Sequence, residues 1–208
     1  MVLVKICGIT SLEDALAATE AGADALGFNF YPRSARFVTP KEARSIIDRL
    51  PRSVLSVGIF VNEGGPEVVR RIAAEAGVAA VQLHGDESPD YCHALKDRSV
   101  IKALRVRHGF RPEDATQYQT EAILLDAFCA DVRGGTGRTF DWSLARRARE
   151  LVPKLFLAGG LTPGNVGAAV QAVGPYAVDT CSGVEHSPGR KDASRMRAFV
   201  DAARRAPL

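Results

Sequence analysis

The stretch VLVKICGITSLEDALAATEAGADALGFNF, residues 2–30, decides the fold. It contains an apolar, β-branched run at 2–6, an amphipathic pattern over 11–22 with Ser11 as its cap, and a second apolar run at 23–30. A strand, a helix and a second strand in this order predict a βαβ unit, whose two strands are parallel.

The same alternation continues along the whole chain. Marking where each apolar run ends gives spacings of 20 to 32 residues, which is a regular rhythm of strand and helix. Eight such units predict a (β/α)₈ barrel, the TIM barrel, as a single α/β domain over 1–208, because an open doubly wound sheet would rarely need so many strands. The expected strands are 2–6, 23–30, 54–61, 78–84, 100–106, 122–127, 155–159 and 176–180. The expected helices lie within 11–22, 39–50, 65–77, 88–98, 111–119, 141–151, 162–174 and 192–205.

Length and composition narrow the class of protein. The chain has 208 residues, 46% of them hydrophobic, and a net charge of only +3, so it gives no footprint for a nucleic-acid or membrane partner. It has no charged leader followed by an apolar stretch, and no apolar run approaches the ~18 residues that span a bilayer. The four cysteines show no CxxC pair and no histidine at zinc spacing, which predicts neither a metal nor a disulfide framework. We expect a cytoplasmic protein with reduced thiols.

Two polar residues follow apolar strands at positions that matter in a barrel. Side chains at the carboxyl ends of the strands share one basin, and both Cys7 and Asp126 are placed there. A thiol can act as a base or nucleophile if its pKa falls, although position alone leaves Cys7 equally open to being a small buried hydrophobe. A desolvated carboxyl group at Asp126 can serve as a general acid, and capping a backbone turn is the alternative. Together they suit proton transfer without a cofactor.

The loops after the seventh and eighth strands predict an anion site. Gly159 and Gly160 precede a helix start that we place at Thr162 as the cap, and Ser182 and Gly183 follow the eighth strand. Exposed backbone N–H groups at a helix start bind anions, and these two loops commonly form the phosphate site of a barrel. Each glycine pair alone is weak evidence, but the two pairs at these two loops support each other.

Other motifs carry less information. The loop after the second strand contains Arg36, which could bind a carboxylate bidentately, and Arg33, which we expect on the surface. The segment RGGTGRT, 133–139, fails the Walker-A pattern and fits a mobile flap better. His84 at a strand end is a secondary candidate, and Cys92 in a helical pattern is expected to pack in the core.

With these pieces in place, the sequence resembles the phosphoribosylanthranilate isomerase family of tryptophan biosynthesis nearly from end to end. The family's segments occur here in the family's order, and the series is highly specific although any one could be chance. It departs from the expected pattern at three places: PRSAR replaces PKSPR around Arg33 and Ala35, Arg138 replaces Lys, and Cys181 replaces Ser. The matching segments are KICGIT, GFNFYPRSARFV, GIFVN, VQLHGDE, LLDA, GGTGRTFDW, LAGGLTPGNV, DTCSGVE and PGRKD.

The resemblance implies a (β/α)₈ barrel and a reaction without metal or cofactor, an Amadori rearrangement of a phosphorylated sugar–anthranilate compound. It implies Cys7 as the catalytic base, Asp126 as the general acid and Arg36 as the group that binds the substrate carboxylate. The phosphate site then falls on the loops that hold Gly159, Gly160, Ser182 and Gly183. The oligomeric state stays open between monomer and homodimer.

Three alternatives remain. An aminoketose-forming isomerase of the histidine-pathway type would share the phosphate loops but use a carboxylate where this chain has Cys7. A non-catalytic phosphosugar-binding barrel would keep the anion site and leave the thiol and carboxyl pair unexplained. A thiol-redox protein is a poorer choice, because the sequence places no second cysteine to resolve a disulfide with Cys7.

Overall fold

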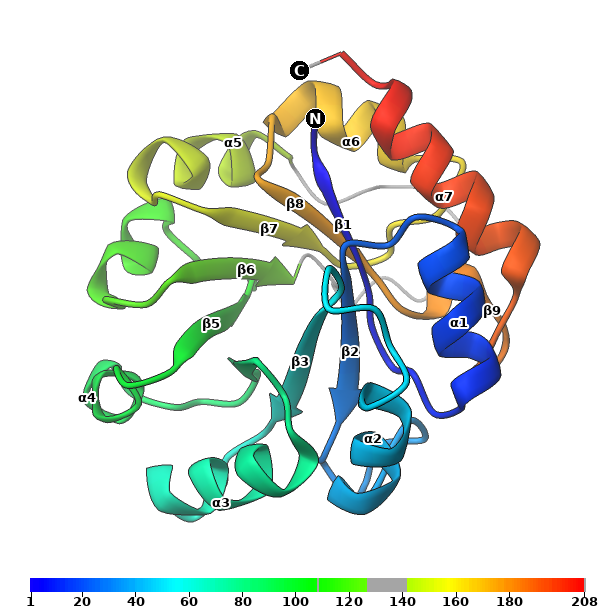
Figure 1. The fold of residues 1–208 in the computed structure, drawn as a ribbon. Helices are drawn as coiled ribbons and strands as arrows, with labels where there is room; N and C mark the ends of the chain where they lie inside the picture. The colour runs from blue at the N-terminus through cyan, green and yellow to red at the C-terminus, as the bar shows by residue number, and fades with distance from the viewer. Residues whose placement is uncertain (108, 127–141, 208) are drawn as a thin grey trace.

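A computed structural model describes residues 1–107, 109–126 and 142–207. Eight parallel strands close into a barrel in chain order, and β1 pairs with both β2 and β8 (Figure 1). The prediction of a (β/α)₈ barrel is therefore confirmed. The barrel strands are β1 (Leu3–Ile6), β2 (Ala25–Asn29), β3 (Leu55–Phe60), β4 (Ala80–Leu83), β5 (Ser99–Arg105), β6 (Ala122–Asp126), β7 (Leu155–Ala158) and β8 (Ala177–Thr180).

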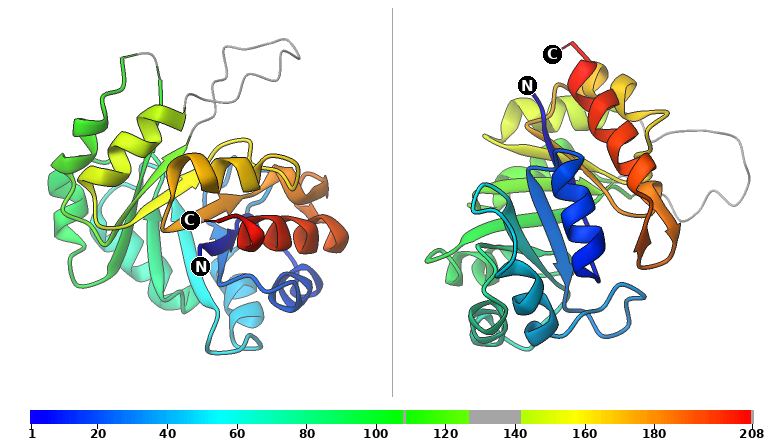
Figure 2. Two further views of the ribbon diagram at one scale, coloured as in Figure 1. Left: turned by 90° about the horizontal axis from the view of Figure 1, so that it is seen from above. Right: turned by 45° about the vertical axis from the view of Figure 1, so that its right-hand side comes forward.

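Helices surround the barrel as an outer layer, and α1 and α7 lie side by side near the two chain ends (Figure 2). Most predicted helices occur within a few residues of their expected bounds. No helix in the described parts of the chain is long and apolar enough to cross a membrane. The helices are α1 (Leu12–Glu20), α2 (Pro40–Ile47), α3 (Pro66–Ala76), α4 (Pro89–Ala94), α5 (Trp142–Leu151), α6 (Val166–Val173) and α7 (Ala193–Arg205).

Three local predictions need correction. The segment at 111–119 forms only a short 3-10 helix, η1 (Pro112–Gln117), in which the Thr116 hydroxyl donates to the Glu113 carbonyl at 2.8 Å. The helix expected from Thr162 begins at Val166 instead, after a turn. A short antiparallel pair that was not predicted lies beyond η2 (Ser182–Val184), formed by β9 (Glu185–Ser187) and β10 (Arg190–Lys191).

The alternation of side chains along each strand builds the site. Leu3, Ala80, Ala122 and Ala177 belong to one apolar cluster, and side chains two and four residues further along the same strands lie on the same face. On these four strands the next side chains on the inner face are Lys5, Gln82, Leu124 and Asp179. The side chains two residues further on reach the mouth of the barrel. These side chains at the mouth are Cys7, His84, Asp126 and Cys181, and all four line the cavity.

Candidate active site

All seven residues predicted for the site line one cavity of about 380 Å³ at the carboxyl ends of the strands. Cys7 and Asp126 come from β1 and β6, and Arg36 comes from the loop after β2. Gly159 and Gly160 line the cavity from the loop after β7, and Ser182 and Gly183 line it from η2. The sequence-based expectation that these groups share one basin is therefore met in space.

Cys7 follows β1 directly and lies in a tightly packed corner. Its backbone N–H donates to the Thr180 carbonyl on β8 at 2.8 Å, which continues the strand pairing to the thiol. Gly8 adopts a φ of +74°, and a Cβ atom there would come within 2.8 Å of both the Arg36 side chain and the Cys181 sulfur. A residue other than glycine would be strained in this conformation, so Gly8 permits the turn that brings these three side chains together.

A buried ion pair lies below the thiol. Lys5 Nζ is 2.8 Å from Asp179 Oδ1, and both side chains are almost completely buried. Burial raises the pKa of Asp179 to about 6, against the opposing effect of Lys5. Asp179 in turn raises the pKa of Lys5 in spite of its burial, and the Lys5 ammonium also hydrogen-bonds the Cys7 sulfur. The Lys5 ammonium, held in place by Asp179, is therefore a fixed positive charge below Cys7.

A second thiol lies beside the first, which corrects the expectation that no cysteine is placed near Cys7. A hydrogen bond from Cys181 lowers the pKa of Cys7 well below its ordinary value, and the charges of Lys5, Lys191 and His84 add to this effect against desolvation. The same hydrogen bond, together with burial, raises the pKa of Cys181. Between the two thiols, the negative charge is therefore favoured on Cys7 and the proton on Cys181, which is the arrangement that a base requires.

Asp126 lies at the end of β6, where its carboxyl group meets a histidine. His84 Nε2 is 3.2 Å from Asp126 Oδ2, and the other ring nitrogen of His84 is 2.8 Å from Gln82 Nε2. Both His84 and Asp126 are about one quarter exposed and line the cavity. His84, a secondary candidate in the sequence, is therefore a neighbour of the predicted acid.

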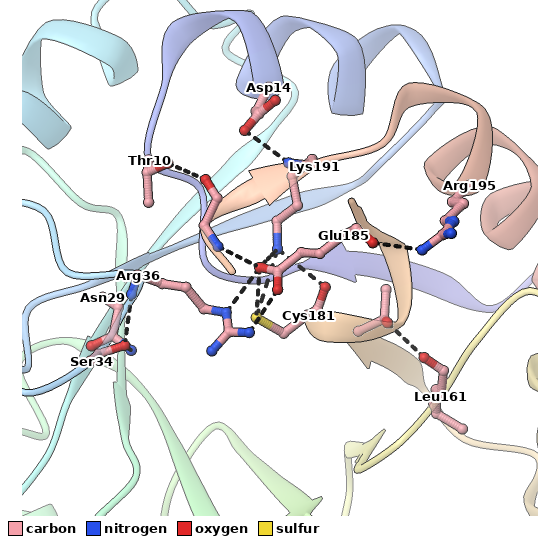
Figure 3. Close-up of polar contacts among 12 residues, drawn as sticks. Thr10, Asp14, Asn29, Ser34, Arg36, Leu161, Cys181, Glu185, Lys191 and Arg195 are labelled. Carbon is pink, nitrogen blue, oxygen red and sulfur yellow. Dashed lines mark hydrogen bonds and ion pairs between the residues drawn. The ribbon is translucent and has the colours of Figure 1, made fainter. Parts of the chain in front are cut away.

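Arg36 is held by a group that the sequence analysis did not assign to the site. Its Nε donates to Glu185 Oε1 at 2.9 Å and its Nη2 to Oε2 at 2.6 Å. Lys191 Nζ also donates to Glu185 Oε1 at 2.9 Å, and Figure 3 shows Arg36, Lys191 and Cys181 converging on this carboxylate. Glu185 occupies the Nε–Nη2 edge of the guanidinium, which leaves the Nη1–Nη2 edge for a second carboxylate.

The two glycine loops are packed against each other. A Cβ atom at Gly183 would lie only 2.0 Å from the Leu161 carbonyl oxygen, and the Thr180 hydroxyl donates to that same oxygen at 2.7 Å. Gly159 and Gly160 have φ values of +88° and +68°, so they form a turn that favours glycine. The close contact explains the need for glycine at position 183, and the positive φ explains it at 159 and 160; all three line this end of the cavity.

Residues that the sequence analysis missed are the charged groups inside the barrel and behind Arg36. A signal for Lys5 and Asp179 was present, because each is a charged residue within an otherwise apolar strand, two positions before a cavity residue. Glu185 and Lys191 lie in the quoted segments DTCSGVE and PGRKD, but nothing local indicates that they pair. Arg33 is exposed and Cys92 is buried, as expected. The segment 133–139 and Cys129 lie outside the described residues.

A closed (β/α)₈ barrel with a thiol and a carboxyl group facing one cavity, next to glycine-rich loops after β7 and β8, has the arrangement of a barrel enzyme with its active site at the carboxyl ends of the strands. The chain belongs to the N-(5'-phosphoribosyl)anthranilate isomerase family, whose model matches residues 4–202. The family is an isomerase family of tryptophan biosynthesis.

Individual relatives agree with this assignment over nearly the full chain. An N-(5'-phosphoribosyl)anthranilate isomerase of Trichlorobacter lovleyi is 52% identical over 206 residues, which cover 99% of this chain and 100% of the relative. The crystal structure of the phosphoribosyl anthranilate isomerase of Thermotoga maritima is 47% identical, with a TM-score of 0.90, over 98% of this chain and 99% of that one. A further structure of such an isomerase, in complex with reduced 1-(o-carboxyphenylamino)-1-deoxyribulose 5-phosphate, is 45% identical, with a TM-score of 0.87 and the same coverage.

Proposed function

We propose that this chain converts N-(5-phosphoribosyl)anthranilate into the corresponding 1-deoxyribulose 5-phosphate aminoketose, with Cys7 as base and Asp126 as acid. The observation that carries this proposal is the placement of a thiol with a lowered pKa and a carboxyl group on one cavity. A non-catalytic sugar-phosphate binder would need neither the buried cation beneath Cys7 nor the paired thiol beside it.

The substrate has an anion at each end, and the cavity offers a matching group for each. The backbone of the two glycine loops is suited to the phosphate, because N–H groups at a loop and a short helix start bind anions. The outer edge of Arg36 is suited to the anthranilate carboxylate, since Glu185 already orients the guanidinium. Fixing both ends places the sugar between Cys7 and Asp126.

The reaction then needs two proton transfers. Asp126 gives its proton to the ribose ring oxygen, the bond between that oxygen and C1 breaks, and an iminium forms. The iminium acidifies the hydrogen on C2, which the Cys7 thiolate removes to leave an enolamine. Tautomerisation of the enolamine, in which the C2 hydroxyl loses a proton and C1 gains one, gives the aminoketose. Proton exchange with solvent then removes the proton from Cys7 and restores one on Asp126. We expect no metal and no redox cofactor in these steps.

The test is turnover of freshly prepared phosphoribosylanthranilate, followed by the loss of its anthranilate-type fluorescence. We expect Cys7→Ala and Asp126→Asn each to lower kcat on the order of 10²-fold or more, the scale of general acid–base catalysis, while still binding a product analogue. Absence of turnover by the unmodified protein would contradict the proposed reaction, and near-normal turnover of either variant would contradict the role given to that residue.

Arg33 and Arg36 form a matched pair for the carboxylate site, because both belong to the loop after β2 and only Arg36 lines the cavity. We expect Arg36→Met to raise KM by about tenfold or more, the scale of losing hydrogen bonds to a charged group. Arg33→Met should leave KM unchanged. Equal effects of the two substitutions would remove Arg36 from the binding site.

We also propose that residues 1–208 act as one barrel domain, that the protein works in the cytoplasm, and that it is a monomer or a homodimer. The small net charge of +3 supports a small-molecule partner rather than nucleic acid or a membrane. Analytical ultracentrifugation decides between the two oligomeric states.

A further inference from the structure

Gln82, His84 and Asp126 form a connected line across the mouth of the barrel. Gln82 on β4 is 1% exposed, and its Nε2 donates to His84 Nδ1 at 2.8 Å. Since Nδ1 then acts as an acceptor, the hydrogen of the neutral ring lies on Nε2 and is donated to Asp126 Oδ2 at 3.2 Å. In this arrangement the amide sets the tautomer of the histidine, and the histidine holds the carboxylate.

The other end of the amide needs an explanation. Gln82 Oε1 is buried and has no hydrogen-bond partner within the described residues. Leaving a buried oxygen without a partner destabilises the folded protein, so its persistence calls for a reason. A half turn of the amide lets Oε1 accept from Nδ1–H, and Nε2 of His84 then accepts from a protonated Asp126. The two orientations of Gln82 therefore match the two protonation states of Asp126.

We propose that His84, held by Gln82, is a positioning residue for Asp126: it keeps the carboxyl group aimed into the cavity both before and after the proton is given up. The proposal rests on the role of Asp126 proposed above. A general acid changes from donor to acceptor within one turnover, and a histidine whose second nitrogen faces a reversible amide can follow that change.

The charged surroundings of His84 allow a pH test. Asp126 faces it from β6, Arg105 Nη2 lies 3.4 Å from its carbonyl oxygen, and Lys102 points away towards Glu87 at 2.6 Å. Cys7 and Asp179 are the other titratable groups that interact with it, and a charged His84 lowers the pKa of both, so its replacement moves the acid limb of the profile through Cys7. A change in the alkaline limb of the profile then reports on Asp126.

Two isosteric variants separate the two contacts. His84→Asn retains a nitrogen near Nδ1 and loses the contact to Asp126, whereas His84→Gln retains one near Nε2. We expect His84→Asn to lower kcat about tenfold with little change in KM. The alkaline limb of kcat should move to higher pH, because a donor to the carboxylate is lost. His84→Gln should recover most of kcat, and the exposed control His93→Asn should match the unmodified protein.

Circular dichroism and binding of a product analogue establish that each variant is folded. A pH profile of His84→Asn that overlies that of the unmodified protein would overturn the inference. If His84→Asn gives that unchanged profile while Asp126→Asn is inactive, only the inference about His84 is overturned and the role of Asp126 stands. Full activity of Asp126→Asn would instead overturn the role of Asp126 itself.

A different observation carries a second inference, about Cys7 and Cys181. Ile6 pairs with Thr180 across β1 and β8, and Cys7 and Cys181 are the residues that directly follow these two. The Cys7 N–H donates to the Thr180 carbonyl, the Cys181 sulfur lies 2.8 Å from where a Cβ of residue 8 would be, and each thiol shifts the pKa of the other. Facing residues on neighbouring strands lie about 4.8 Å apart, within the range of about 4.4–6.8 Å that a disulfide spans. Both residues line the cavity and are partly exposed.

We infer that this pair is a site of reversible oxidation by peroxides. The Cys7 thiolate attacks hydrogen peroxide, which gives a sulfenic acid at Cys7 and releases hydroxide. The Cys181 thiol then attacks the sulfenic sulfur, so a disulfide forms and water leaves. A dithiol reductant restores both thiols and takes up the two oxidising equivalents.

The test treats the whole protein with hydrogen peroxide, then measures cross-linked peptides by mass spectrometry and turnover before and after dithiothreitol. We expect a Cys7–Cys181 peptide, loss of turnover and its recovery on reduction. After peroxide, Cys181→Ser should lose turnover that dithiothreitol does not restore, because without a second thiol the sulfenic acid at Cys7 is oxidised further. Cys129→Ser should retain the cross-link. A disulfide that joins Cys7 to another cysteine, or no disulfide at full inactivation, would overturn the inference.

Discussion

Replacing Lys5 with methionine tests how the barrel interior serves the thiol. Methionine keeps the length and apolar stem of lysine but removes the charge that lies 2.8 Å from Asp179 and hydrogen-bonds Cys7. Removing one partner of a buried pair leaves the other charge without compensation, which costs about 3–5 kcal/mol. We therefore expect the free energy of unfolding at pH 7 to fall by about that amount.

The loss should depend on pH in a direction that follows from Asp179. Its pKa in the folded protein is about 6, above its ordinary 3.8, so the stability that it contributes is present below 3.8 and is lost as pH rises through 6. This shift corresponds to about 3 kcal/mol at 1.36 kcal/mol per unit. At pH 5 Asp179 carries a proton with or without Lys5, so the difference between variant and unmodified protein should be smaller than at pH 7.

Turnover gives an independent measurement on the same variant. The Lys5 charge lowers the pKa of Cys7, so its removal raises that pKa and moves the acid limb of kcat/KM to higher pH. Urea unfolding at pH 5 and 7 and pH–rate profiles measure the two effects. Arg147→Met, which breaks an ion pair with Glu113 exposed by more than half on both sides, is the control and should change stability by about 0–1 kcal/mol.

Equal free energies of unfolding for Lys5→Met and the Arg147→Met control at pH 7 would contradict the stabilising role given to Lys5. A larger destabilisation of Lys5→Met at pH 5 than at pH 7 would contradict the titration given to Asp179. If the stability falls as expected but the acid limb of kcat/KM does not move, Lys5 stabilises the fold without affecting the pKa of Cys7.

Two further substitutions probe the walls of the cavity. Gly183→Ala should raise KM about tenfold in steady-state assays, because its Cβ would lie 2.0 Å from the Leu161 carbonyl oxygen and the glycine loops must separate. The control Gly164→Ala, whose Cβ meets no atom nearer than 3.8 Å, should leave KM unchanged. Glu185→Gln should lower the free energy of unfolding by about 3 kcal/mol, since Lys191 is buried and loses its 2.9 Å counter-charge; urea unfolding measures this, and an unchanged midpoint would contradict it.

The architecture could be predicted from local patterns because each βα unit repeats the same signals. Apolar runs bounded by caps and turns placed all eight strands within a few residues, and the strand ends located Cys7 and Asp126 on one face. In a barrel this face follows from chain direction alone, so two residues far apart in sequence can be assigned to one basin without knowing any contact.

The details that depend on register and on long loops could not be predicted in this way. The bidentate contact of Arg36 to Glu185 joins residues 149 positions apart, and it decides which edge of the guanidinium faces the cavity. The proximity of Cys181 to Cys7 depends on the pairing of β1 with β8, which closes the barrel. Neither contact has a local signature, and the expectation that no second cysteine lies near Cys7 was therefore wrong.

For Lys5, the sequence predicts the position of the side chain but not its partner. Its position two residues before Cys7 in an apolar strand is enough to place it on the same face, below the thiol, because strand side chains alternate. A lysine enclosed by a barrel needs a counter-charge, and only the register of β8 identifies Asp179 as that partner. The sequence therefore predicts a positive charge below Cys7. Which residue neutralises it, and so the net electric field at Cys7, follows only from the pairing of β1 with β8.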